Sequence, residues 1–163
     1  MSDRADDYAN QFQELSRQFI ATIEGYTPEQ MQARCVGEQC TVAALASHIA
    51  GVHNLVADWV VKSANGEPLP ELTMDTVNAI NADQFARDAN RPKSEIIASL
   101  RENGAAAAEV VRNLDDAQLD RSSYFTLFGR DVTTDWLVQN ILIGDIANHS
   151  ASIRAACGEA ATA

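Results

Sequence analysis

Residues 41–63 read TVAALASHIAGVHNLVADWVVKS, and the prediction of the fold starts from these residues. Apolar side chains recur along it every three or four residues, which is the spacing of one face of an α-helix. These positions are Val42, Leu45, Ile49, Val52, Leu55, Val56, Trp59 and Val60. Thr41 is a residue type that caps a first helical turn, and residues 65–70, NGEPLP, cannot continue a helix. The sequence therefore predicts a long amphipathic helix over residues 41–63.

Three other stretches have the same periodicity, and they lie over residues 5–26, 94–114 and 133–157. Ser94 is the expected cap of the third long helix, either Thr133 or Thr134 that of the fourth, and a glycine near residue 158 the expected terminator. Shorter helices are expected from Thr27 onward and over residues 73–89, a loop over 35–40, and either an extended segment or a buried loop over 124–128. Four long helices with a long connection between the second and third predict an all-α four-helix bundle. We expect residues 1–163 to form one domain with a frayed tail over 158–163.

Composition and charge exclude several classes of function. The chain has 163 residues, 46% of them apolar, and a formal net charge of −11. This charge, with no cluster of Lys or Arg, argues against binding to nucleic acid or to an anionic membrane. We expect no membrane span and no signal peptide, because no apolar run approaches the necessary length and the N-terminus is acidic. Three cysteines give no disulfide framework, which favours a reducing, cytoplasmic setting.

Two polar residues interrupt the apolar face of the fourth long helix. Asp145 and His149 are four residues apart, so they project in the same direction from the stripe that should be packed. The other members of this face are Val138, Leu142, Ile153 and Ala156. A lone buried carboxylate costs several kcal/mol unless another group compensates it. A divalent metal is such a group, since carboxylate oxygen and neutral imidazole nitrogen are both normal ligands.

The second long helix supplies a third candidate ligand. His48 lies between Leu45 and Val52 on the inward arc, and facing helices in a bundle are about 8–10 Å apart. Three protein ligands with one open position are typical of a catalytic metal site. His53 lies near the edge of the same arc, and periodicity alone does not choose between the two histidines.

Simpler interpretations stand beside each of these. Asp145 and His149 also fit an ordinary i, i+4 side-chain pair, or a helix rolled so that both are exposed. His53 also fits a core histidine whose ring nitrogens are hydrogen-bonded. Cys35 and Cys40 also fit two ordinary buried or exposed thiols rather than half of a zinc site. Trp59, Trp136 and the aromatic residues of the 125–128 segment fit packing against the core.

Residues 35–50 read CVGEQCTVAALASHIA, and they resemble the entry to the second helix in the DinB/YfiT-like superfamily. The resemblance is greatest to the branch with the mycothiol-dependent maleylpyruvate isomerases, and it extends through LDDAQLD at 114–120 to the final helix. Cys40 departs from the pattern, because the family usually has tryptophan there. In this superfamily a histidine of the second helix and two ligands one turn apart on the last helix hold a metal. Those positions correspond to His48, Asp145 and His149.

The resemblance implies a small metal-dependent enzyme acting on a small-molecule substrate. The implied cofactors are a divalent metal, zinc or nickel, and a low-molecular-weight thiol, and the implied reaction is thiol-dependent transfer or isomerisation. Hydrolysis by a metal-activated water is the alternative chemistry. A stress-related binding or dimerisation module, in which the polar cluster is only structural, is the non-enzymatic alternative. We also expect a homodimer. No general acid or base is assigned by the sequence.

Overall fold

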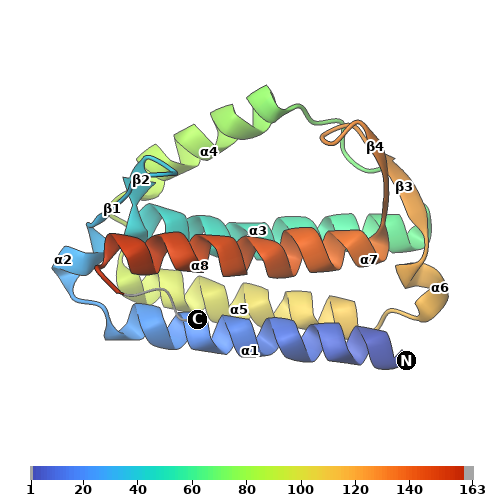
Figure 1. Ribbon diagram of the computed structural model, residues 1–163, viewed down its shortest axis with the longest axis horizontal. Coiled ribbons are helices and arrows are strands. Elements are labelled where there is room, and N and C mark those ends of the chain that lie inside the picture. The colour runs from blue at the N-terminus through green and yellow to red at the C-terminus, as the bar shows by residue number, and fades with distance from the viewer. Residues whose placement is uncertain (1, 160–163) are drawn as a thin grey trace.

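The computed structural model describes residues 2–159. Four long rods run side by side along the longest axis of the molecule (Figure 1). They are α1 (Asp3–Gly25), α3 (Val42–Asn65), α5 (Lys93–Arg112) and a last rod made of α7 (Thr134–Trp136), the π-helix η1 (Leu137–Ile143) and α8 (Gly144–Ala156). The predicted all-α four-helix bundle is confirmed.

The remaining elements lie at the ends of the bundle or on its side. They are α2 (Pro28–Met31), β1 (Arg34–Cys35), β2 (Cys40–Thr41), α4 (Met74–Asp88), α6 (Asp116–Leu119), β3 (Ser122–Phe125) and β4 (Arg130–Thr133). The hairpin β1–β2 is at one end, and α6 with the hairpin β3–β4 is at the other (Figure 1). Helix α4 is the expected helix in the connection between α3 and α5. It packs against α3 and leans away from the bundle toward β3–β4.

The apolar stripes of the long helices form one core. Helix α3 packs against α4, α5, η1 and α8, while α1 packs mainly against α5. The largest fully buried side chains are Phe12, Phe19, Ile23, Leu45, Ile49, Ile96, Leu100, Leu119, Phe125, Leu137, Leu142 and Ile146. Leu55 differs from the other members of the α3 stripe, because half of its surface is exposed. Among the described residues no helix has the length and apolar character needed to cross a membrane.

The helix starts follow the expected caps with one exception. Thr41 Oγ1 accepts a hydrogen bond from the Ala44 amide at 3.1 Å, and Thr133, rather than Thr134, caps the last rod through the Trp136 amide. The prediction that Ser94 caps α5 is wrong. Lys93 is already helical directly after Pro92, so Ser94 falls inside the first turn, where its side chain makes no capping hydrogen bond.

Three further segments differ from or refine the expectation. The predicted loop over 35–40 is the turn of a hairpin, and its end residues Cys35 and Cys40 are paired in the strands β1 and β2. The 124–128 segment is extended in β3 before it turns. Residues 137–143 form a π-helix, whose wider turn brings Leu137, Val138, Leu142 and Ile143 inward together. The last helix ends before Gly158, whose φ of 75° is the left-handed conformation of a glycine terminator. Residues 160–163 of the expected frayed tail lie outside the described part.

Candidate metal centre

His48, Asp145 and His149 meet between α3 and α8. One ligand atom from each residue can be chosen so that all three lie within 4.8 Å of one another. Each side chain is half-buried. The structure therefore brings together the three residues that the sequence identified, across nearly 100 residues of chain.

Asp145 and His149 also make the simple pair that the i, i+4 spacing predicts. Oδ1 of Asp145 lies 3.3 Å from Nε2 of His149. Their side chains are only 18% and 22% exposed, so the helix is not rolled to turn them toward solvent. The pair points at His48, whose ring centre is 5.3 Å from that of His149 with the two planes nearly perpendicular.

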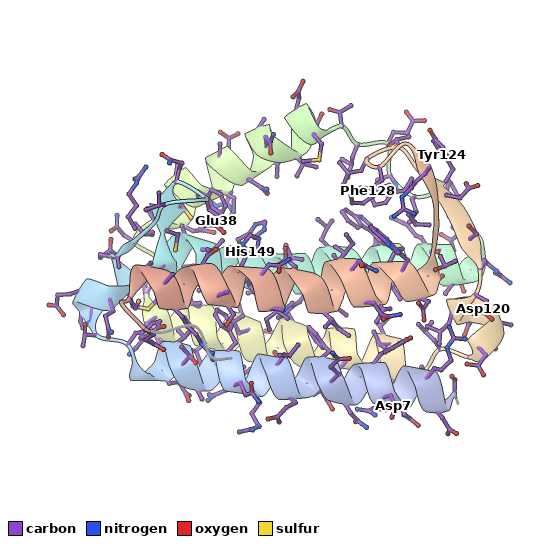
Figure 2. All side chains as sticks on the ribbon, viewed as in Figure 1. Asp7, Glu38, Asp120, Tyr124, Phe128 and His149 are labelled. Carbon is purple, nitrogen blue, oxygen red and sulfur yellow. The ribbon has the colours of Figure 1, made fainter. Side chains whose placement is uncertain are left out.

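Glu38 is a fourth member of the site, and the sequence interpretation missed it. Its Oε1 lies 3.0 Å from Nδ1 of His149. Glu38 belongs to the turn between β1 and β2, which projects over α8, as Figure 2 shows with both residues labelled. The only sequence signal was a single acidic residue in a segment expected to be a loop, and this is too common to single it out.

Burial and charge act differently on the two histidines. Burial lowers the pKa of His48, and the nearby Asp145 charge only partly opposes this. Burial would also lower the pKa of His149, but the hydrogen bonds and negative charges of Asp145 and Glu38 outweigh it and raise that pKa. The lowered pKa favours neutral His48, which can bind a cation without first losing a proton. The raised pKa means that His149 holds its proton more tightly, and it must lose that proton before Nε2 can bind a cation.

The residues present fit a divalent cation. Oδ2 of Asp145 is buried and has no hydrogen-bond partner among the described residues. A buried carboxylate oxygen left unpaired is destabilising, and a cation shared with His48 and His149 would compensate it. Two imidazole nitrogens and one carboxylate oxygen are a donor set that zinc and nickel accept. Within residues 2–159 no other set of three His, Cys, Asp or Glu side chains is placed to hold a metal.

His53 does not join this group. It is 1% exposed and packs edge-on against Phe12, with ring centres 4.9 Å apart. The predicted location of His53 in the core is therefore confirmed. The expectation that its ring nitrogens are hydrogen-bonded is wrong, because neither has a partner among residues 2–159. Burial lowers the pKa of His53 to about 4, which keeps the ring neutral.

An apolar cavity of about 490 Å³ begins at His48 and Asp145 and extends between α3, α4 and η1. Its walls include Val52, Leu55, Trp59, Val77, Ile80 and Ile141. Its polar lining residues beyond the candidate metal centre are Asp58, Lys62 and Asn81. The exposed Leu55 of the α3 stripe is therefore a wall of this cavity. A volume of this size suits a small organic molecule.

Comparison with known proteins supports the fold. Residues 11–144 match the sequence profile of the DinB superfamily, a range that includes His48 and ends just before Asp145. YfiT from Bacillus subtilis, described as "a probable metal-dependent hydrolase with an unusual four-helix bundle topology", has a similar structure, with a TM-score of 0.73 and 18% sequence identity over 98% of this chain and 91% of that chain. No curated protein matches the sequence. Because the profile covers most of its length, the chain belongs to the DinB superfamily.

Proposed function

We propose that the protein is a divalent-metal-dependent enzyme that acts on a small molecule with an apolar body. The observation that carries the proposal is the convergence of His48, Asp145 and His149, of which His48 and Asp145 line one end of an apolar cavity. A polar cluster that only stabilised the bundle would have no need to open onto such a cavity. Zinc and nickel are the metals we propose, because the donor set contains two imidazoles and one carboxylate.

A divalent cation at this site would supply Lewis acidity, which lowers the pKa of a water or thiol and makes a nucleophile available near neutral pH. The chain's own residues perform the remaining tasks. Glu38 fixes the ring of His149 through Nδ1, which leaves Nε2 directed toward Asp145. The apolar walls hold the substrate body, so that its reactive group points at His48 and Asp145.

For the reaction we propose thiol-dependent transfer or isomerisation, with a low-molecular-weight thiol as co-substrate. The support is the resemblance of residues 35–50 and of the Asp145-x3-His149 pair to the branch with the thiol-dependent isomerases. Hydrolysis is the second candidate, and its support is the description of the structurally similar YfiT. A non-enzymatic module is the third, because Glu38, His149 and Asp145 already form a connected polar row.

A paired assay tests the proposal. Tag-free protein is stripped with a chelator and reloaded with zinc or nickel. It is then given either an apolar aryl halide with a thiol, or apolar esters and amides without one. We expect thiol consumption only in the reloaded protein, its loss in His48→Ala, and its retention in His53→Leu, the histidine outside the cluster. Thiol-independent hydrolysis would favour the second candidate, and equal inertness of stripped and reloaded protein on a broad panel would favour the third.

A further inference from the structure

Cys35 and Cys40 face each other on the hairpin β1–β2. They are directly paired residues in the antiparallel register, and both are free thiols that are almost fully buried. Paired residues of antiparallel strands have Cα atoms roughly 4.5–5.5 Å apart. A disulfide joins Cα atoms roughly 4.4–6.8 Å apart, so the backbone already has the spacing that a bridge requires.

The two thiols also differ in acidity. The interaction between them raises the pKa of Cys35 and lowers that of Cys40. One thiol is thereby the better nucleophile, and the other is held next to it.

A metal site does not account for this pair. No third His, Cys, Asp or Glu completes a metal site with Cys35 and Cys40 among the described residues. The turn that the pair closes carries Glu38, which contacts His149.

We propose that Cys35 and Cys40 form an oxidisable dithiol, a modification site whose co-substrate is a low-molecular-weight disulfide. The Cys40 thiolate attacks one sulfur of that disulfide, its S–S bond breaks, and one thiolate leaves with the electron pair. The Cys35 thiol then loses its proton to the solvent or the released thiolate and attacks Cys40 Sγ, which expels the second thiolate. Two protein thiols are oxidised to one disulfide, and the small disulfide is reduced to two thiols. The inference does not depend on the proposed function.

Peptide mapping tests the inference on the unaltered protein. Folded protein is incubated with glutathione disulfide, blocked with an alkylating reagent and digested with trypsin. Cleavage after Arg34 and Lys62 releases both cysteines in one peptide, residues 35–62, whereas Cys157 falls in a separate peptide. We expect the 35–62 peptide to lose two hydrogens and to escape alkylation, and a dithiol reductant to restore both thiols. A 35–62 peptide that remains fully reduced, or a bridge to Cys157, would overturn the proposal.

Single-cysteine variants test the order of attack. In Cys35→Ser we expect the reaction to stop with one glutathione attached at Cys40, and in Cys40→Ser we expect little reaction at Cys35. Cys157→Ser is the matched control and should oxidise like the natural protein. Attachment to Cys35 in Cys40→Ser as fast as to Cys40 in Cys35→Ser would contradict the assignment of Cys40 as the attacking thiol. The unaltered protein keeps the test decisive even if a serine variant fails to fold.

Discussion

Oε1 of Glu38 lies 3.0 Å from Nδ1 of His149, although 111 residues separate them in the chain. The contact fixes which ring nitrogen of His149 faces Asp145 and His48. An acidic partner of this kind orients a ligand histidine and increases its basicity. The side chain of Glu38 thus connects the hairpin β1–β2 to the candidate metal centre on α8.

Replacement of Glu38 should weaken metal binding without removing a ligand. We expect Glu38→Ala to lower the affinity for zinc about 10- to 100-fold, which is the usual effect of losing such a partner. Competition with a chromophoric chelator measures the change. Glu29→Ala, at an exposed glutamate in α2, is the control and should bind zinc like the natural protein. Unchanged affinity in Glu38→Ala would show that His149 is oriented by other contacts.

Two helical glycines should respond differently to alanine. A Cβ at Gly51 of α3 would meet nothing within 4 Å, so Gly51→Ala should stabilise the protein by about 1 kcal/mol through helix propensity. A Cβ at Gly104 of α5 would lie 2.9 Å from Ser16 Oγ, so Gly104→Ala should be at least ~1 kcal/mol less stable than Gly51→Ala. Urea denaturation gives both values.

The double variant Ser16→Ala/Gly104→Ala checks the cause of this difference. Without the hydroxyl, the nearest Ser16 atom to the new Cβ is its own Cβ, at 4.0 Å. We expect the double variant to recover stability relative to Gly104→Ala alone. No recovery would mean that the Ser16 contact is not what limits residue 104.

His53 should make the metal-free protein sensitive to mild acid. Its pKa is lowered from its ordinary 6.5 to about 4 by burial, so the unfolded chain takes up a proton first as the pH falls. The stability that the neutral ring retains above pH 6.5 is therefore lost progressively toward pH 4. Between pH 7 and pH 5 we expect the free energy of unfolding to fall by about 2 kcal/mol less in His53→Leu than in the natural protein. Denaturant unfolding at both pH values in chelator tests this, and parallel losses in the two proteins would contradict it.

The apolar cavity should be sensitive to charge on α4. Ile80 lines the cavity and is 56% exposed, so a polar residue there should leave the fold intact. For the most active apolar substrate we expect Ile80→Asp to raise KM about tenfold, as for the loss of one apolar side-chain contact, with metal content unchanged. Ala82→Asp adds the same charge at an exposed site of α4 outside the cavity and serves as control. Equal KM values for both variants would argue against substrate binding in this cavity.

Local sequence signals predicted much of the fold. The stripe and cap of residues 41–63 gave α3 almost residue by residue, because helix periodicity and the Thr41 cap depend only on near neighbours. Asp145 and His149 could be paired for the same reason. Which of His48 and His53 meets this pair depends on how α3 is oriented toward α8. The periodicity of the sequence alone does not determine that orientation. The role of Glu38 and the π-helix at 137–143 were not predicted, since each depends on contacts between distant segments.

Metal content shows whether His48, Asp145 and His149 bind a cation together. Tag-free protein incubated with zinc, freed of excess ion and submitted to elemental analysis should hold about one divalent ion per chain. His48→Ala and His149→Ala should hold none, Asp145→Asn should hold much less, and His53→Leu should hold as much as the natural protein. A natural protein that retains no ion, or His48→Ala and His149→Ala variants that retain as much as it does, would contradict the account.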